Sequence, residues 1–162
     1  MEKWKEVPNY EGRYWVSNLG RVKNESHLLS LGLQSGRYHS TTLSKDGVRK
    51  SFLVHQLVAI AFLNFVPNGN KLIVDHIDNN PLNNNLENLQ VITHRQNLSK
   101  DKKNKTSKYT GVSKHNTSGK WLAQIRDGKK VISLGCYDDE FEAHLAYQKK
   151  LGELLTASPS EL

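Results

Sequence analysis

Residues 73–97, IVDHIDNNPLNNNLENLQVITHRQN, constrain the fold more than any other part of the chain. The β-branched stretch KLIVDHI leads into a long polar run rich in asparagine, and the chain then returns to the apolar LQVI. Apolar, β-branched stretches predict short strands, and asparagine suits turns because it tolerates left-handed backbone and hydrogen-bonds its own chain. The segment therefore predicts a strand, a long loop and a second strand.

A helix is predicted directly after the second strand. Thr93 is a favourable N-cap residue, and Gln96 three positions later completes a capping box. Asn97 then lies in the first turn, near the positive end of the helix dipole. At the other end of the loop, Asp75 and His76 close the first strand. Successive strand residues point to opposite faces, so these two can face one site only where the strand ends and twists.

Asp75, His76 and Asn97 form the minimal set of groups that phosphodiester hydrolysis requires. The reaction needs a base that takes a proton from water, and a cation that neutralises charge on the phosphate and the leaving oxygen. Histidine is suited to act as the base. Carboxylate and amide oxygens suit a hard cation such as magnesium. A plain asparagine-rich surface loop is the competing interpretation.

The segments before this one predict short strands followed by one helix. Residues 1–52 contain short alternating stretches, and Asp46-Gly47 between two of them predicts a tight hairpin turn. Residues 54–65, VHQLVAIAFLNF, have apolar side chains at 3- and 4-residue spacings, as in an amphipathic helix. His55 at its start is interpreted as a packed or capping residue, with a ligand role as the alternative.

The segments after it predict a basic linker and a second small module. Residues 93–114 hold seven basic residues against the single acid Asp101, so this stretch attracts a polyanion unless it is only a solvated linker. From Tyr109 onward the pattern predicts three strands joined by turns at Ser118-Gly119 and Asp127-Gly128. A helix capped by Asp138 or Asp139 then follows.

Composition excludes several classes of protein. No apolar run approaches the roughly 18–20 residues that a membrane helix needs, and the first residues do not resemble a signal peptide. Cys136 is the only cysteine, which excludes disulfide frameworks and cysteine-rich zinc sites. We expect no membrane partner, no zinc and a cytoplasmic location in a bacterial or phage-infected host cell.

The central stretch DHIDNNPLNNNLENLQVITHRQN resembles the HNH nucleases, which are built on a ββα-metal fold, and most of all the phage and intron-encoded homing endonucleases. The match rests on the order and spacing of Asp75-His76, Asn88 and Asn97. The resemblance implies that Asp75 and Asn97 bind one divalent cation per active site, Mg²⁺ or Mn²⁺. It implies that His76 is the general base and that Asn88 is structural and orients the loop.

Both flanking segments carry resemblances of their own. WKEVPNYEGRYWVSNLGRVKN resembles the short modular motif that precedes HNH cores in such enzymes, where this β-rich part lies against DNA. YTGVSKH, GKWLAQIR, LGCY and EAHLAY resemble pieces of the AP-two (ethylene-response-factor) DNA-binding domain, in which a three-stranded sheet enters the major groove with a helix behind it. Thr110, Ser113 and Ser133 replace residues typical of the plant domains, so the plant target sequence is not expected.

Together these observations predict an α+β chain with three parts. They are an N-terminal antiparallel β module in residues 1–52, an HNH ββα-metal core in residues 53–104, and a three-stranded antiparallel sheet packed on one helix in residues 105–156. The expected partner is double-stranded DNA, bound by a monomer or weak dimer. The candidate DNA contacts are Arg13, Arg21, Lys23, Arg37, Arg95, Lys100, Lys102, Lys103, Lys114, Lys120, Trp121, Gln124 and Arg126.

The predicted function is site-specific DNA cleavage by single-metal hydrolysis, leaving 5′-phosphate and 3′-hydroxyl ends. The alternative is a non-catalytic DNA-binding regulator with a decayed nuclease core. The presence of all three chemical residues favours the enzyme. The target sequence, the preferred metal, the number of strands cut and the role of His94 stay open at this point.

Overall fold

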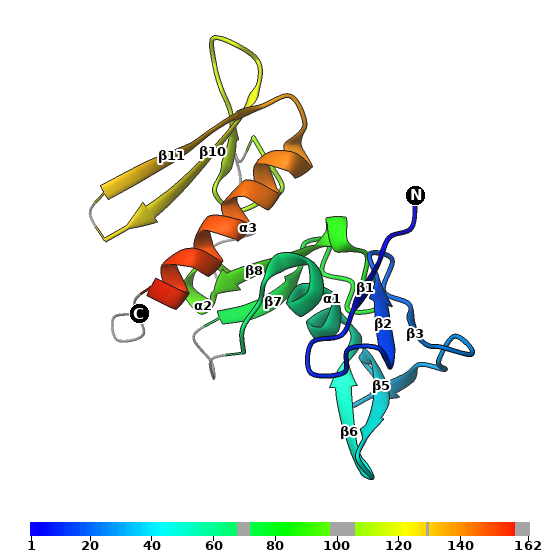
Figure 1. Cartoon of the computed structure of the whole chain (residues 1–162). Coiled ribbons are helices and arrows are strands. Elements are labelled where there is room, and N and C mark those ends of the chain that lie inside the picture. The colour runs from blue at the N-terminus through cyan, green and yellow to red at the C-terminus, as the bar shows by residue number, and fades with distance from the viewer. Residues whose placement is uncertain (68–71, 98–105, 129, 158–162) are drawn as a thin grey trace. The chain divides into compact units, whose positions relative to one another are not determined.

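A computed structural model describes residues 1–67, 72–97, 106–128 and 130–157, shown in Figure 1. The chain forms two compact units, Met1–Phe65 with Val74–Leu89, and Val66–Ile73 with Gln90–Leu162. Each unit therefore combines segments that are distant in sequence. Helices and small antiparallel sheets alternate along the chain, which confirms the predicted α+β class.

The first sheet of the first unit contains β1 (Trp4–Glu6), β2 (Tyr14–Ser17) and β3 (Val22–Asn24) in that order. Val16 and Val22 lie opposite each other in the register and are both buried. Gly20 has φ +78° in the turn between β2 and β3, a conformation that glycine adopts without steric cost. The turn allows the chain to reverse within a few residues and to bring the two valines together.

The second sheet contains β4 (Gly32–Gln34), β5 (Tyr38–Lys45) and β6 (Val48–Leu53), with β5 in the centre. Lys45 pairs with Val48, and both residues between them, Asp46 and Gly47, have positive φ. Positive φ at both central residues is the pattern of a type I′ hairpin turn. The hairpin predicted from Asp46-Gly47 is therefore confirmed.

Helix α1 (Val54–Leu63) follows β6 without a loop and supplies more buried apolar residues than any other element of the first unit. Val54, Leu57 and Val58 are almost completely buried. Asn64 adopts the left-handed conformation that commonly ends helices, and Pro67 follows shortly after. The predicted helix is confirmed and ends two residues earlier than its sequence pattern indicated.

The strand, loop, strand and helix predicted at the centre of the chain are also confirmed. β7 (Leu72–His76) and β8 (Leu89–Thr93) form a two-stranded sheet, a short 3-10 turn η1 (Leu86–Asn88) ends the loop, and α2 (His94–Asn97) follows. The amide of Thr93 donates to Gln96 Oε1 at 2.9 Å, and the amide of Gln96 donates to Thr93 Oγ1 at 3.3 Å. The capping box is thus present in both directions.

The second unit contains an antiparallel sheet in the order β11-β10-β9, made of β9 (Val112–Lys114), β10 (Trp121–Asp127) and β11 (Lys130–Tyr137). Helix α3 (Glu140–Ala157) packs on this sheet, as Figure 1 shows, with Ala123, Ile125 and Ala143 buried between them. Asp139 Oδ1 accepts hydrogen bonds from two amides of the first turn of α3, both at 2.9 Å. The predicted strands, helix and acidic cap are confirmed.

Within the described ranges, the helices are too short or too polar to cross a lipid bilayer.

Candidate functional site

Asp75 and His76 end strand β7, and both side chains are buried, with 8% and 7% of their surface exposed. The strand stops here because the next backbone groups turn away from it. The amide of Asn79 donates to the carbonyl of His76 at 3.0 Å, which is the bond of a tight turn. Asn79 itself has φ +61°, which asparagine tolerates better than most residues. Two polar side chains are therefore buried at the place where the strand ends.

Asn88 joins the two ends of the long loop. Its Oδ1 accepts from the amide of Asp78 at 3.0 Å, and its Nδ2 donates to Asp78 Oδ1 at 2.8 Å and to the carbonyl of Asn83 at 2.9 Å. Its carbonyl also accepts from the amide of Ile77 at 2.9 Å. These bonds hold the residues directly after His76 against the start of β8.

Asp78 is the acceptor around which the loop turns. Partial burial raises its pKa, but hydrogen bonds from the Asn83 side chain, the Asn80 amide and the Asn88 side chain lower it more, so the net shift is downward. The amide of Asn80 donates at 2.8 Å and the side chain of Asn83 at 2.8 Å. The asparagines of the loop therefore have different tasks, and several of them keep one carboxylate ionised.

The sequence interpretation missed a group of side chains around His76. The ring of His55, from α1, lies 5.0 Å from the His76 ring in an edge-on arrangement. The ring of Tyr38, from β5, lies 5.2 Å from His55 and 6.2 Å from His76. His55 does pack, as its first interpretation stated, but it packs against the candidate base. A buried polar residue on the apolar face of α1 was the available signal, and only the fold shows what that face meets.

His55 is held neutral by its surroundings. Burial, followed by the proximity of His76, lowers its pKa from 6.5 to about 4. Among the described residues, its Nδ1 atom is buried and has no hydrogen-bond partner. An uncharged imidazole beside His76 adds bulk and excludes water without adding positive charge at neutral pH.

The loop residue Asn84 connects His76 to strand β5. Its Oδ1 lies 3.2 Å from His76 Nε2, and its Nδ2 lies 3.1 Å from Nδ1 of His39. Asn84 is 4% exposed, so these polar contacts are made away from solvent. Neither Asn84 nor His39 was predicted as a site residue from the sequence. Asn84 could not be distinguished there, because it lies among other asparagines in a polar run.

Asn97 is the last described residue of α2 and belongs to the second unit, where its side chain is half-buried. Helix α2 is anchored within that unit, because Gln96 Nε2 donates to the hydroxyl of Tyr147 at 3.0 Å. Burial raises the pKa of Tyr147, and the bond from Gln96 offsets part of that rise. The phenol of Tyr147 therefore stays protonated near neutral pH.

The residues expected to hold a metal are oxygen donors. Among the residues that the structure describes, no group of three or more histidine, cysteine, aspartate or glutamate side chains gathers as a metal site. A carboxylate from Asp75 and an amide oxygen from Asn97 are a donor set that suits a hard divalent cation, which completes its shell with water and phosphate oxygens. The donor chemistry of these two residues fits a hard divalent cation such as magnesium or manganese.

Three candidate DNA contacts of the N-terminal segment, Arg13, Arg21 and Arg37, are exposed, whereas Lys23 is half-buried. Arg13 pairs with Asp46 at 3.5 Å, and Arg21 pairs with Glu2. Both side chains of the Arg13–Asp46 pair are exposed, and such a pair contributes at most about 1 kcal/mol, so a phosphate can replace this carboxylate.

Aromatic rings support the other basic groups of this segment. Lys23 Nζ lies 4.8 Å from the ring centre of Trp4 and 5.7 Å from that of Trp15. The guanidinium of Arg37 lies 5.9 Å from the ring centre of Tyr38. Trp4 and Trp15 are half-buried, so they serve partly as core residues and partly as a platform for cations.

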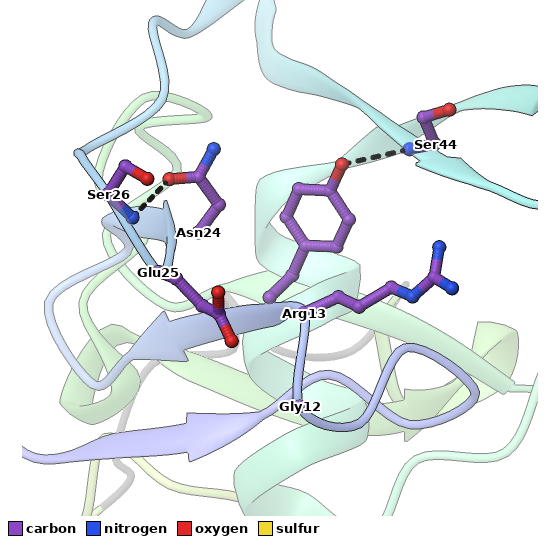
Figure 2. Close-up of a pocket in the computed structure, with 7 residues that line it drawn as sticks. Gly12, Arg13, Asn24, Glu25, Ser26 and Ser44 are labelled. Atoms are coloured by element: carbon purple, nitrogen blue, oxygen red, sulfur yellow. Dashed lines mark hydrogen bonds between the residues drawn. The ribbon is translucent and has the colours of Figure 1, made fainter.

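Figure 2 shows a polar hollow of about 270 Å³ beside this segment. The hydroxyl of Tyr14 accepts a hydrogen bond from the Ser44 amide at 3.2 Å, and the Asn24 side chain accepts one from the Ser26 amide at 2.9 Å. Its lining residues are Gly12, Arg13, Tyr14, Asn24, Glu25, Ser26 and Ser44, and none of them belongs to the group around His76.

The sheet of the second unit presents a polar face away from α3. Gln124 lies opposite Ser133 in the register, and Arg126 lies opposite Val131, with all four residues exposed. Lys120 pairs with Asp138 at 2.9 Å. Gln124 and Arg126 are residue types that read base edges, and they lie side by side on one strand.

Two of the candidate contacts are close to each other where the edge strand β9 pairs with the central strand β10. Lys114 and Trp121 are paired in the register, and Lys114 Nζ lies 5.3 Å from the Trp121 ring centre. The side chain of Arg95, and Lys100, Lys102 and Lys103 entirely, lie outside the described residues, as does most of the predicted basic linker.

Two family models match the chain. An HNH endonuclease model matches residues 52–99, which include the strand, loop, strand and helix at its centre. A NUMOD4 motif model matches residues 2–47. This is the segment whose sequence resembles the module that precedes HNH cores.

Curated relatives carry the same description. The chain is 37% identical over 133 residues to the DNA endonuclease I-HmuI of Bacillus phage SP01, a match that covers 80% of this chain and 71% of that protein. It is 35% identical over 95 residues to the H-N-H endonuclease F-TflII of Escherichia phage T5, covering 57% of this chain and 49% of that protein.

A solved structure is also similar. It is described as DNA binding and cleavage by the HNH homing endonuclease I-HmuI, and the match has 39% sequence identity and a TM-score of 0.55. The match covers 60% of this chain and 56% of that chain.

Proposed function

The chain belongs to the HNH homing endonuclease family, and from this premise we propose how it acts on DNA. It is a site-specific DNA endonuclease of the HNH type. The observation that carries the chemical proposal is the burial of Asp75 and His76 together at the end of β7, within the matched segment. The reaction is hydrolysis of a phosphodiester that leaves 5′-phosphate and 3′-hydroxyl ends.

His76 is the proposed general base. Its ring accepts a proton from the attacking water and becomes positively charged. Because His55 beside it is neutral, it does not repel this charge. Asp75 and Asn97 are the proposed ligands of one divalent cation, Mg²⁺ or Mn²⁺, and enzymes of this family depend on such a cation. When bound, the cation neutralises charge on the scissile phosphate and the leaving oxygen.

Asn88 is the proposed structural residue of the site. Its four hydrogen bonds, to Ile77, Asp78 and Asn83, support this role, because they fix the chain directly after His76. A base must be held within hydrogen-bond reach of its water to be effective. Asn88 would act on the rate by keeping His76 at the end of the strand, without touching the substrate.

The flanking parts are the proposed source of DNA affinity. The C-terminal sheet is proposed to bind DNA as an AP-two-like domain, supported by an exposed strand face carrying Gln124 and Arg126 and by a helix packed on the opposite face. The N-terminal segment would contact phosphates through Arg13, Lys23 and its other basic groups. Binding through phosphates should weaken steeply as salt is raised.

The proposed organisation has three parts, with the N-terminal module in residues 1–52, the nuclease core in residues 53–104 and the C-terminal DNA-binding domain in residues 105–156. The protein is proposed to work as a monomer or weak dimer in the cytoplasm of a bacterial or phage-infected cell. One metal site per chain then corresponds to one strand cut per binding event.

A plasmid assay tests this function. Supercoiled DNA that carries candidate sites is incubated with the protein and magnesium, with manganese, or with a chelator. Cleavage is expected only with metal, and its loss is expected in His76→Ala and in Asn97→Ala. His27→Ala is the matched control, because His27 is an exposed histidine outside the site, and it should cleave like wild type.

The same assay separates the enzyme from a DNA-binding regulator with a decayed core. A protein that shifts DNA in a gel but cuts it with neither metal would be the regulator. Cleavage by His76→Ala at the wild-type rate would show that the base is another residue. Ligation of the products by DNA ligase without prior kinase treatment would verify the proposed end chemistry.

A further inference from the structure

Asn84 is oriented by contacts that identify both ends of its amide. Its Nδ2 lies 3.3 Å from the carbonyl oxygen of Leu82, an atom that can only accept a hydrogen bond. The end of the amide that faces Leu82 must therefore be the NH₂ group. The other end, which faces His76, is then the oxygen, and an amide oxygen can only accept. The hydrogen-bond network therefore assigns the orientation of the Asn84 amide, because exchanging its oxygen and nitrogen would place two acceptors against each other at Leu82.

This orientation determines which nitrogen of His76 carries a proton. Asn84 Oδ1 lies 3.2 Å from His76 Nε2, so Nε2 must be the donor of that bond. In a neutral imidazole one nitrogen is protonated and the other holds the lone pair. A hydrogen on Nε2 places the lone pair of neutral His76 on Nδ1. Nδ1 is therefore the atom of this ring that can accept a proton from water.

Asn84 is itself held by residues of the N-terminal segment. A β-carbon added at Gly20 would lie 2.6 Å from Asn84 Cβ and 3.0 Å from its carbonyl oxygen, so the two backbones are in close contact. The amide of Leu86, two residues along, donates to the carbonyl of Asn18 at 2.8 Å. His39 Nδ1, from β5, lies 3.1 Å from Asn84 Nδ2 and accepts from it. Groups distant in sequence thus surround one asparagine.

We propose that Asn84 is a positioning residue for DNA cleavage. It fixes neutral His76 in the form protonated at Nε2, so that Nδ1 is the nitrogen that acts as the base. The Ser17–Gly20 turn and His39 hold the Asn84 side chain in place. The proposal rests on the proposed function of His76. It gives the N-terminal segment a second task besides binding DNA. Asn84 differs in this from Asn88, which bonds the loop backbone and makes no bond to the ring in the described contacts.

The test uses the full chain and two kinds of measurement. Proton–nitrogen correlation spectra of the histidine rings are recorded in mildly alkaline buffer, where histidine is neutral. Single-turnover cleavage and DNA affinity are then measured for wild type, Asn84→Ala and Asn84→Asp. Asn84→Asp keeps an acceptor oxygen for His76. Asn64→Asp is the matched control, because it makes the same chemical change at an exposed residue outside the loop.

Wild type is expected to show a His76 ring protonated at Nε2, with that proton protected from exchange. Asn84→Ala should lose the protection and cleave about 10- to 100-fold more slowly, by analogy with the range found when the residue that orients a metal-bound histidine is removed. Its DNA dissociation constant should stay within about twofold of wild type, since the Asn84 side chain is buried and is not exposed for contact with DNA. Asn84→Asp should keep the protected Nε2 proton and cleave faster than Asn84→Ala. Asn64→Asp should match wild type.

Two results would overturn the proposal. One is a wild-type His76 ring protonated at Nδ1, and the other is an Asn84→Ala protein with unchanged spectra and an unchanged cleavage rate. If Asn84→Ala does not fold, a folded Asn84→Asp protein without the protected Nε2 proton overturns it equally. The spectra do not depend on activity, so failure of His76 as the base, seen as cleavage by His76→Ala, stays distinguishable from failure of the Asn84 contact.

Discussion

Replacing Gly20 by alanine should destabilise the first unit far more than the same replacement at Gly12. Both glycines have nearly the same backbone conformation, φ +78° and φ +71°. Any residue with a β-carbon in this left-handed region costs about 1–2 kcal/mol. This strain cost is therefore the same in both variants. Both variants also gain about 0.4–1 kcal/mol of stability, because alanine makes the unfolded chain less flexible than glycine does.

The difference between the two sites lies in the space around them. Nothing lies within 4 Å of a β-carbon added at Gly12, whereas one at Gly20 meets Asn84 at 2.6 Å. Overpacking of this kind costs about 1–3 kcal/mol, because backbone rather than a flexible side chain must move. We expect Gly12→Ala to lose about 1 kcal/mol and Gly20→Ala about 2–4 kcal/mol, a large part of the roughly 5–15 kcal/mol of a typical domain.

Equilibrium urea unfolding measures both values. The amide signals of Val16 and Leu43, which are fully buried in the first unit, report on that unit alone. The two variants should unfold at different urea concentrations with the same dependence on urea. Equal midpoints would refute the reasoning, because the Asn84 contact would then cost nothing. Gly20→Ala should also cleave DNA more slowly than Gly12→Ala, since it displaces Asn84.

Three further predictions concern residues away from this contact. His55 is protonated near pH 6.5 in the unfolded chain but only near pH 4 in the folded chain. The free energy of unfolding should therefore be highest above pH 6.5 and fall by roughly 3 kcal/mol towards pH 4. Urea titrations of His55→Leu at several pH values should lack this part of the loss. Gln148 bonds both the amide and the carbonyl of Val91 at 3.2 Å, so Gln148→Leu should lose about 2–5 kcal/mol, while the exposed neighbour Lys149→Ala should stay within about 0.5 kcal/mol of wild type. Thr93→Ala should lose about 1 kcal/mol through its capping box, and a calorimetric melting temperature equal to wild type would contradict this.

The sequence was most informative where structure is determined by near neighbours. The Asp46-Gly47 turn, the capping box at Thr93 and the acidic cap at Asp139 each depend on a few adjacent residues, and all three are present. The strands around the asparagine-rich loop followed from short apolar stretches in the same way. Local rules of this kind need no knowledge of the remaining chain.

The surroundings of His76 could not be predicted in this way. Tyr38, His39 and His55 come from a strand and a helix that precede the loop, and only the packing of the first unit brings them to the ring. Asn84 could not be separated from the asparagines beside it, because its distinction is burial against Gly20. The spacing of the motif indicated which residues are candidates for the chemistry, but it contained no information on which residues surround them.

The hydrogen bonds of α3 limit where the C-terminal domain can be exchanged to direct this enzyme to another DNA target. Its Gln148 and Tyr147 bond Val91 and Gln96, which belong to β8 and α2 of the nuclease motif. A chimaera joined near residue 104 would replace α3 and remove those hydrogen-bond partners from β8 and α2. A successful exchange would keep α3 with its parent nuclease and graft only the strand face that carries Gln124 and Arg126. The recombination boundary in this protein is thus set by hydrogen bonds and not by the order of the modules along the gene.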